Sequence, residues 1–203
     1  MLRQNAAMPA DWFDEAYVGA PPWDIGRPQP EFVKLVDSGR IKGAVLDVGC
    51  GTGEHVLLLK ERGYDVMGID GSPRAIERAL SKARQRRLDA RFEVADALDL
   101  SALNRTFDTV LDSGLFHVFP DDERARFLKS LASVLRPGGA YFMMCFSEHQ
   151  PGNWGPRRVT QAEIRAAFRD GWRVESITPS MFETLGEPAK AWLASLTRTK
   201  PGD

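Results

Sequence analysis

The chain has 203 residues, a length that suits one globular domain with a substantial core. Its formal net charge of −1 provides no general attraction to nucleic acid or to an anionic membrane, so neither is expected as a partner. Two cysteines, Cys50 and Cys145, are too few for a disulfide framework, and the first residues lack the apolar stretch of a signal peptide, so a cytoplasmic protein is expected.

Residues 1–40 differ in composition from the rest of the chain. They are rich in tryptophan, proline and acidic residues, and within them a helix is expected near residues 31–36. These features indicate a flank or lid over the active site rather than a second domain. Residues 41–203 are then expected to form the main domain.

From residue 41 onward, short apolar runs alternate with longer amphipathic ones, the pattern typical of βαβ units in a parallel sheet. Ser72 is expected to cap one of the helices, with Pro73 in its first turn. The expected strands of this half are 44–48, 64–69 and 91–95, and the expected helices are 54–62 and 73–87.

The second half of the chain completes the sheet with strands 107–111, 141–146, 172–177 and 191–196. Asp121 or Asp122 can cap a helix that ends near Leu135, and Thr160 with Glu163 forms a capping box for another. The last two strands are joined by too few residues for a crossover helix, so they should pair antiparallel. The predicted fold is an α/β, Rossmann-like sheet of seven strands, mostly parallel, with helices on both faces and a C-terminal antiparallel hairpin.

A glycine turn at Gly49, Gly51 and Gly53 joins the first expected strand to the first helix of the main domain. Glycine permits a tight turn there and lets a ligand approach the backbone N–H groups at the helix N-terminus. Glu54 stands where the third glycine of a dinucleotide fingerprint would fall. With Asp47 before the turn and Glu54 after it, the pattern favours a ligand that carries positive charge and is not a polyphosphate.

Asp70 ends the second expected strand, about 20 residues beyond the glycine turn. A carboxylate at this place can accept hydrogen bonds from both hydroxyl groups of a ribose. It could instead cap the following helix, but Ser72 is the better cap. We therefore predict that Asp70 binds ribose.

Together these motifs resemble the class I S-adenosylmethionine-dependent methyltransferases, over about residues 40–200. Residues 45–53 are similar to the first motif of that family, residues 68–72 to its second, and residues 107–112 and 135–139 to later ones, in the same order and spacing. The resemblance implies S-adenosyl-L-methionine as the cofactor. The cofactor-binding residues assigned on this basis are Trp23, Asp47, Gly49, Gly51, Gly53, Asp70, Gly71, Asp96, Ala97, Asp112 and Ser113.

The resemblance also implies particular roles for three of these residues. Asp96 and Ala97, after the third strand, would hold the adenine amino group, although Asp96 could also be a loop residue that starts a helix. Asp47 would orient the glycine turn or the amino group of the ligand, directly or through water.

The proline-rich part of the flank carries a further resemblance. Residues 21–30 are similar to the Trp-Asp-x-Gly-x-x-x-Pro segment of the thiol/halide and thiopurine-type methyltransferases, a small-molecule subgroup. In that subgroup such tryptophans line the cofactor pocket, where an aromatic face attracts a desolvated sulfonium. This implies a cofactor contact for Trp23, although Trp23 could instead only anchor the flank to the main domain. For Trp12 the two interpretations are equal.

Residues 112–119 follow the fourth expected strand, at the sheet edge that should face the methyl group. We assign catalysis here to Asp112 and to His117, because histidine can take a proton near neutral pH. A histidine in an apolar run is often only packed and hydrogen-bonded, so that interpretation of His117 stays open. The thiol/halide enzymes carry a tyrosine where Ser113 stands, so their chemistry does not transfer directly. No metal is expected, because the nearby carboxylates are better explained as helix caps.

The predicted function is methyl transfer from S-adenosylmethionine to a heteroatom (S, O or N) of a small, apolar or aromatic molecule, by a monomer or homodimer. One alternative is a methyltransferase of the same fold that acts on protein or RNA, which the lack of an Asn-Pro-Pro-Tyr-type motif and the near-zero charge disfavour. A second is a non-catalytic S-adenosylmethionine-binding module. A third, a nicotinamide-dependent oxidoreductase, is disfavoured by the glycine spacing.

Overall fold

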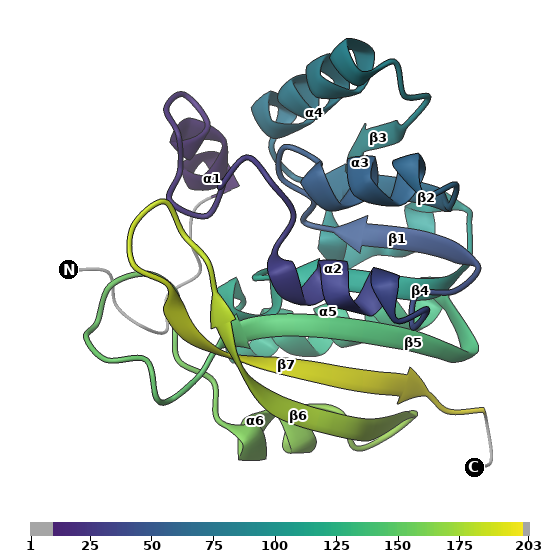
Figure 1. Ribbon diagram of the computed structural model, residues 1–203. Helices are drawn as coiled ribbons and strands as arrows, with labels where there is room; N and C mark the ends of the chain where they lie inside the picture. The colour runs from purple at the N-terminus through teal and green to yellow at the C-terminus, as the bar shows by residue number, and fades with distance from the viewer. Residues whose placement is uncertain (1–9, 201–203) are drawn as a thin grey trace.

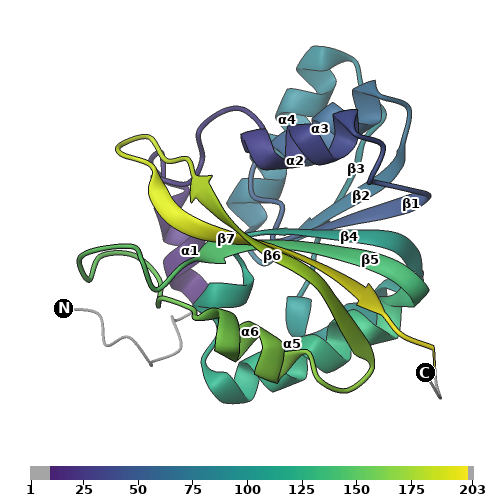
Figure 2. The ribbon, with the colours of Figure 1, turned by 60° about the horizontal axis from the view of Figure 1, so that its bottom comes forward.

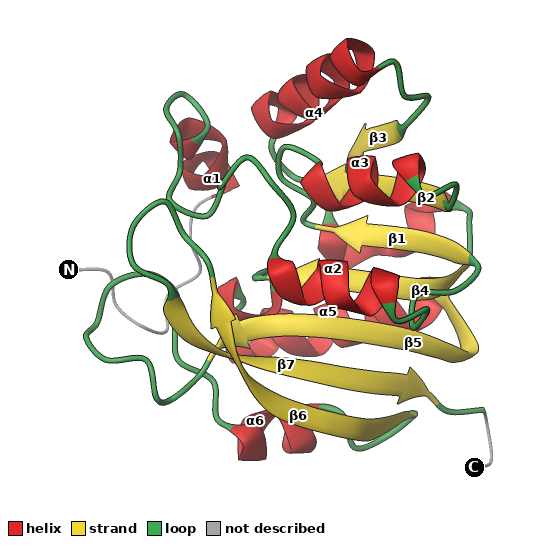
Figure 3. Cartoon of the chain, viewed as in Figure 1, coloured by secondary structure: helices red, strands yellow, loops and turns green. Residues whose placement is uncertain are grey.

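The computed structural model describes residues 10–200, which form one mixed sheet covered by helices (Figures 1 and 3). The elements in chain order are α1 (Ala10–Ala16), α2 (Pro30–Asp37), β1 (Ala44–Val48), α3 (Glu54–Glu61), β2 (Asp65–Asp70), α4 (Pro73–Arg86), β3 (Arg91–Val94), η1 (Ala97–Leu103), β4 (Phe107–Ser113), η2 (Phe116–Val118), α5 (Asp121–Val134), β5 (Leu135–Phe146), α6 (Gln161–Ala167), β6 (Trp172–Phe182) and β7 (Ala189–Arg198).

The sheet has seven strands in the order β3-β2-β1-β4-β5-β7-β6. Neighbouring strands from β1 to β5 pair parallel, whereas β7 pairs antiparallel with both β5 and β6. This confirms the predicted fold class, including the terminal hairpin. The chain leaves β1 in one direction for β2 and later returns to its other side as β4, and ligands of open α/β sheets bind at the carboxyl ends of the strands beside such a point.

Two apolar layers hold helices against opposite faces of the sheet, and β1 shows how one strand supplies both. Val45 packs into the layer that contains α2, α3 and α4 side chains, whereas Leu46 and Val48 pack into the layer of α5 and α6. Figure 2 shows α2, α3 and α4 on one side of the sheet and α5 and α6 on the other. Alternation of side chains along the strand produces this division.

The expected flank of residues 1–40 is not uniform in the structure. Phe32, Leu35 and Val36 of α2 are buried in the same apolar layer as Val45, so α2 is built into the core of the main domain. In contrast, α1 and the loop after it lie beyond the end of the sheet toward which the arrow of β1 points (Figure 1). Residues 1–9 and 201–203 of the two expected ranges lie outside the described part of the chain.

Helix caps follow the sequence signals at two places and depart from them at a third. The Ser72 hydroxyl accepts a hydrogen bond from the Ala75 N–H at 3.1 Å, and the capping box of Thr160 and Glu163 forms in both directions. The cap position of α5, however, is Pro120, without a side-chain cap bond. The prediction that Asp121 or its neighbour caps this helix is therefore wrong; acidic residues in the first turn instead complement the helix dipole.

The last strands are longer than predicted. β6 extends to Phe182 and includes Pro179, which β6 tolerates because it is an edge strand and one side of its backbone carries no ladder hydrogen bonds. β5 begins at Leu135, directly after α5, with a register irregularity opposite residues 107–109. Helix α1 was not expected. Across the described residues no helix combines the length and apolarity needed to cross a bilayer.

Candidate active site

The glycine turn lies between β1 and α3, where the backbone must take left-handed conformations. Gly51 and Gly53 have φ angles of +53° and +86°. A Cβ at Gly51 would lie 2.8 Å from the Tyr17 hydroxyl, and one at Gly53 would lie 2.6 Å from the Phe92 ring. Gly49 belongs to the same turn, and a Cβ there would lie 3.2 Å from Leu115. The turn is therefore enclosed by other segments of the chain, and only glycine fits both its conformation and its neighbours.

Asp70 lies at the carboxyl end of β2 and reaches across to the glycine turn. Its Oδ2 accepts a hydrogen bond from the Gly51 N–H and its Oδ1 one from the Ser72 N–H, each at 2.8 Å. Burial raises the pKa of this carboxyl group, although the two backbone donors lower it. Each oxygen can accept a further bond. A Cβ at the next residue, Gly71, would meet open space. The region beside the glycine turn at the carboxyl ends of β1 and β2, called the crevice below, is therefore accessible at this edge.

Asp47 is the clearest sign that a cation belongs in this crevice. Its side chain is 1% exposed and neither carboxylate oxygen has a hydrogen-bond partner. The Nδ1 atom of His55 lies 3.6 Å from Oδ2, which is too long for a hydrogen bond. A buried carboxylate without partners is unfavourable, and the ammonium group of a ligand would relieve it. The residues present thus fit the amino acid part of S-adenosylmethionine.

Asp96 and Ala97 follow β3 next to the end of β2. The Ala95 N–H donates to the backbone oxygen of Asp70 at 3.1 Å, which brings the two strand ends together. Asp96 Oδ1 accepts from the Leu98 N–H at 2.8 Å, so this residue caps the short helix η1. The side chain is exposed beside the crevice, and capping with one oxygen leaves acceptor capacity for an adenine amino group.

An aromatic cluster from the flank covers the glycine turn. The Trp23 ring lies 5.7 Å from Trp12, 6.2 Å from Phe13 and 6.2 Å from Tyr17, measured between centroids. Its Nε1 donates to the Tyr17 hydroxyl at 2.9 Å. Burial, and then the charge of Asp70, raise the pKa of Tyr17. Sequence reasoning missed Tyr17, whose only signal is its place between a short acidic-aromatic helix and the tryptophan.

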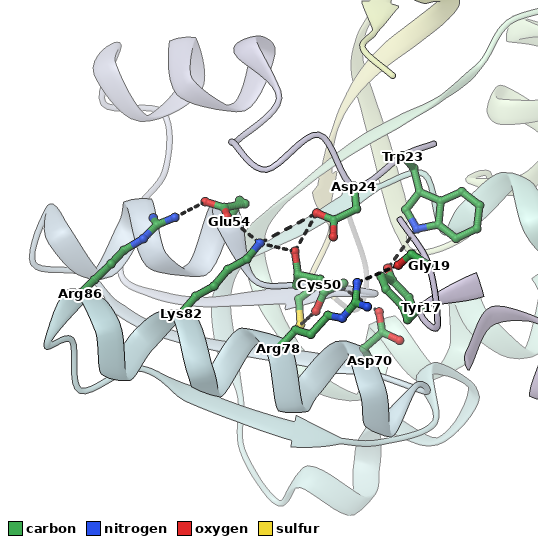
Figure 4. A network of polar contacts seen from close by, with 12 residues as sticks. Tyr17, Gly19, Trp23, Asp24, Cys50, Glu54, Asp70, Arg78, Lys82 and Arg86 are labelled. Atoms are coloured by element: carbon green, nitrogen blue, oxygen red, sulfur yellow. Dashed lines mark hydrogen bonds and ion pairs between the residues drawn. The ribbon is translucent and has the colours of Figure 1, made fainter. Parts of the chain in front are cut away.

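A network of polar side chains ties the flank to α4 and to the glycine turn (Figure 4). The Thr52 hydroxyl donates to Asp24 at 2.7 Å and accepts from Lys82 Nζ at 2.6 Å. Lys82 also pairs with Glu54 at 2.7 Å, and Arg86 pairs with the same carboxylate at 2.8 Å. The charge of Glu54 is thus neutralised from α4. Glu54 therefore does not fit the prediction that it favours a positively charged ligand, whereas Asp47, which has no hydrogen-bond partner in the described residues, does.

Asp112 has a different environment from the one predicted for a catalytic or cofactor-binding group. Its carboxylate is fully buried and accepts hydrogen bonds from the Leu115 N–H at 2.7 Å, the Phe116 N–H at 3.1 Å and the Tyr141 hydroxyl at 2.6 Å. Burial raises its pKa to about 7, against the effect of these donors. With its oxygens used internally, Asp112 holds the turn after β4, which does not fit the catalytic and cofactor-binding roles assigned to it from the sequence. Ser113, one residue later, is half-buried at the strand end.

His117 is packed rather than poised for proton transfer. It is 4% exposed, its Nδ1 accepts from the Phe146 N–H at 2.8 Å, and a Cβ at Gly114 would lie 3.3 Å from its Nε2. Burial, followed by the charges of Arg124 and Arg158, lowers its pKa to about 3. Because its basic nitrogen is already used, His117 does not fit the role of general base, and the packed interpretation describes it better.

The residues around His117 form a wall of rings beside the turn that follows β4. Phe146 lies 5.5 Å from Trp154 and 5.6 Å from Phe182, and we call these three residues the aromatic wall. A Cβ at Gly114 would lie 3.0 Å from Phe182, so the wall abuts the turn after β4. The wall joins strand ends and a loop that are far apart in the sequence, so the meeting of its three rings has no local sequence signal.

Arg158 organises the loop that carries Trp154. Its guanidinium lies 5.5 Å from the Phe146 ring centroid and 5.7 Å from that of Trp154. It also donates to five backbone oxygens of the loop, those of Gln150, Pro151, Gly152, Trp154 and Pro156. The neighbouring Arg157 pairs instead with Asp121 and Glu163. Among residues 10–200 no group of three or more metal-binding side chains converges.

Comparison with known proteins identifies the chain as a methyltransferase. The methyltransferase-domain family matches residues 45–139. The 2-heptyl-1-hydroxyquinolin-4(1H)-one methyltransferase of Mycobacteroides abscessus is 35% identical over 188 residues, which cover 87% of this chain and 83% of that protein. A solved structure from work on the conversion of a disulfide bond into a thioacetal group during echinomycin biosynthesis is 39% identical, with a TM-score of 0.86, over 94% of this chain and 93% of the other. The magnesium protoporphyrin IX methyltransferase of Synechocystis PCC 6803, solved with S-adenosylmethionine bound, shares the fold at 23% identity and a TM-score of 0.65, over 84% and 77% of the two chains.

Proposed function

Because the chain belongs to the class I S-adenosylmethionine-dependent methyltransferases, we propose that it methylates a heteroatom of a small, apolar or aromatic molecule. The cofactor supplies an activated methyl group on its sulfonium. The chain binds it through Asp47 and Asp70 beside the glycine turn, and positions an acceptor against the aromatic wall. An oxygen or sulfur acceptor is favoured over nitrogen, because one similar protein is named for a hydroxyquinolone and a similar solved structure concerns a disulfide converted into a thioacetal.

The observation that carries this proposal is the aromatic wall. Phe146 and Phe182 are buried, whereas the Trp154 side chain is 47% exposed, so the wall leads from the interior to the surface. Flat aromatic or apolar acceptors pack well on such rings, and offset or edge contacts contribute about 0.5–1.5 kcal/mol each. The flank that closes over residues 51–52 supports a small acceptor, because a macromolecular substrate needs an open approach.

The environments of the three histidines favour an acceptor that loses its proton without a general base from the protein. Of the three in the sequence, His117 is packed with its Nδ1 engaged, and His55 accepts through Nε2 from the Gln29 N–H at 3.1 Å. His149 is exposed and lies edge-on to Trp192, with ring centroids 5.3 Å apart. Thiols and acidic hydroxyl groups need no strong base at neutral pH, since a fraction is already deprotonated. We therefore propose acceptors with an acidic O–H or S–H group.

A labelled-methyl assay tests the proposal. The purified protein is incubated with methyl-labelled S-adenosylmethionine and a panel that contains 2-heptyl-1-hydroxyquinolin-4(1H)-one, thiophenols, phenols and N-heterocycles, and products are identified by mass spectrometry. We expect methylation of aromatic N–OH or S–H compounds, with a rate that rises as the acceptor becomes more acidic around the assay pH. In a parallel lysate incubation, label recovered in protein or RNA instead of small molecules would overturn the proposal.

A further inference from the structure

Gln29 occupies a junction between the cofactor side and the acceptor side of the molecule. It is 3% exposed and lies just before α2. Its side-chain amide pairs with the backbone of Glu183, donating to the carbonyl at 2.8 Å and accepting from the N–H at 2.9 Å. Glu183 directly follows Phe182 of the aromatic wall. The Gln29 side chain therefore holds the end of β6 with a pair of hydrogen bonds, much as a neighbouring strand would.

The backbone of the same glutamine contacts the cofactor side. Its N–H donates to Nε2 of His55 at 3.1 Å, so this nitrogen is unprotonated and the imidazole proton resides on Nδ1. Nδ1 in turn faces Oδ2 of Asp47 at 3.6 Å. A series of contacts thus runs from Asp47, through His55 and Gln29, to Glu183. Its first step is the 3.6 Å approach, which is not a hydrogen bond, and its later steps are hydrogen bonds.

Two further contacts fasten the flank to the same hairpin. The Leu185 N–H donates to the backbone oxygen of Pro22 at 2.8 Å, and Arg27 pairs with the Glu183 carboxylate. The hairpin tip between β6 and β7 is therefore held by the flank, and Gln29 is the buried member of this attachment.

We infer that His55 and Gln29 are positioning residues through which cofactor binding at Asp47 fixes the hairpin tip that carries Phe182. The inference rests on the proposed role of the aromatic wall for its consequence, tighter acceptor binding. The coupling itself involves only the chain and the cofactor, and no acceptor is needed to observe it. On this inference the buried Gln29 and His55 transmit cofactor binding to the hairpin, in addition to stabilising the fold.

The direction of the effect follows from the unpartnered carboxylate of Asp47. In the structure Gln29 contacts both His55 and Glu183, an arrangement called here the closed state, and the Asp47 carboxylate is buried without hydrogen bonds. This burial penalises the closed state when no ligand is bound. Loosening of the His55–Gln29 contact would admit water to the carboxylate and relieve the penalty. An ammonium group on Asp47 removes the penalty in the closed state, so cofactor binding shifts the equilibrium toward it.

Amide hydrogen exchange measured by NMR tests this inference without acceptor or turnover. The reporters are the N–H groups of Glu183 and Leu185, and the internal reference is the Thr199 N–H, which donates to Gly171 at 3.0 Å at the other end of the hairpin. In the wild-type protein, saturating S-adenosylhomocysteine should slow exchange at both reporters by roughly tenfold, a typical coupling between sites, and leave the reference unchanged.

Variants separate the path from general stability. Gln29→Ala should abolish the ligand-dependent slowing at Leu185, where the backbone bond itself is untouched. Gln150→Ala is the matched control, because Gln150 is also a buried amide and its Oε1 accepts from the Lys190 N–H at 2.6 Å, but it has no contact with His55. The control should keep the full ligand effect. Asp47→Asn should slow exchange at Glu183 even without ligand, because the buried charge is gone.

Three results would overturn the inference. The first is equal exchange at both reporters with and without S-adenosylhomocysteine in the wild type, at concentrations where calorimetry shows full binding. The second is an undiminished ligand effect in the Gln29→Ala variant. The third is faster or unchanged ligand-free exchange at Glu183 in the Asp47→Asn variant. Each can occur whatever the acceptor is, so failure here is distinguishable from failure of the proposed function.

Discussion

Two aspartates at strand ends show how the proposed cofactor half of the sheet, around β1 and β2, differs from the proposed acceptor half, around β4 to β6. Asp70 ends β2 and is half-buried, with two backbone donors and an open edge beside it. Asp112 lies near the end of β4, is fully buried, and is satisfied by two backbone donors and the Tyr141 hydroxyl. Burial raises the pKa of both carboxyl groups. Position at a strand end therefore does not decide the role of a carboxylate. The ribose-binding role proposed for Asp70 rests on the open space beside it.

The proposed cofactor side and the proposed acceptor side also present different kinds of groups to a ligand. The cofactor half presents carboxylates and a glycine turn within residues 47–97, so its chemistry is polar and local in sequence. The acceptor half presents the aromatic wall, assembled from β5, the following loop and β6. The first suits one fixed ligand with many hydrogen-bonding groups. The second suits apolar acceptors, which shape and area select more than hydrogen bonds do.

The largest effect is expected on the cofactor side. Asp70→Ala removes the ribose acceptor and also the two bonds that hold Gly51 and Ser72, so affinity for S-adenosylhomocysteine should fall by about 100-fold, the equivalent of one or two charge-assisted hydrogen bonds. Calorimetry measures this. Asp65→Ala, at the exposed start of the same strand, is the control and should bind normally. Normal affinity of the Asp70→Ala variant would refute the ribose assignment.

The second prediction concerns Asp112 and the pH dependence of stability. Its folded-state pKa of about 7 lies above the ordinary value of 3.8, so the folded protein binds a proton more tightly than the unfolded chain does. The resulting stabilisation is full below about pH 4 and is lost as pH rises toward 7. Between pH 5 and pH 7 the free energy of unfolding of the wild type should fall by ~1–2 kcal/mol relative to Asp112→Asn.

Urea titrations of both proteins at several pH values measure that difference. Because the Asp112→Asn side chain cannot ionise, all other groups cancel in the comparison. A difference that stays constant, or that grows in favour of the wild type as pH rises, would show that Asp112 remains charged and would reopen its assignment to the active site.

The third prediction tests the acceptor side. Trp154→Ala should raise KM for a good aromatic acceptor by about tenfold through loss of ring contact, with unchanged S-adenosylhomocysteine affinity. Trp154→Phe should recover most of the loss. The residue is about half exposed, so little stability is at stake. If the dissociation constant of the cofactor rose while KM for the acceptor stayed constant, Trp154 would be a cofactor contact and not an acceptor contact.

The smallest effect is expected at His117. Asn can reproduce the acceptor at Nδ1 for the Phe146 N–H but cannot act as a base, so His117→Asn should change kcat less than about threefold between pH 6 and 8. Loss of a general base would instead lower kcat by about 10²–10⁴. Initial rates across that pH range, with the protein shown folded by circular dichroism, distinguish the two interpretations.

The sequence by itself determined the sheet, the glycine turn, the caps at Ser72 and Thr160, and the cofactor class, because these depend on residues that are neighbours along the chain. It could not show that Lys82 and Arg86 neutralise Glu54, since that pairing depends on how α4 packs beside the turn. Nor could it separate Asp70 from Asp112. Their difference comes from Tyr141 and the turn that follows β4.

Only the tertiary structure showed that the aromatic wall forms and that the flank is attached to the hairpin tip. Phe146, Trp154 and Phe182 meet because the antiparallel hairpin folds back beside β5, and Gln29 reaches Glu183 across 154 residues of sequence. Contacts of this kind leave no periodicity or spacing in the chain, because loop closure and burial select them only in the folded state. The proposed cofactor site follows from local motifs, and the proposed acceptor site follows from packing.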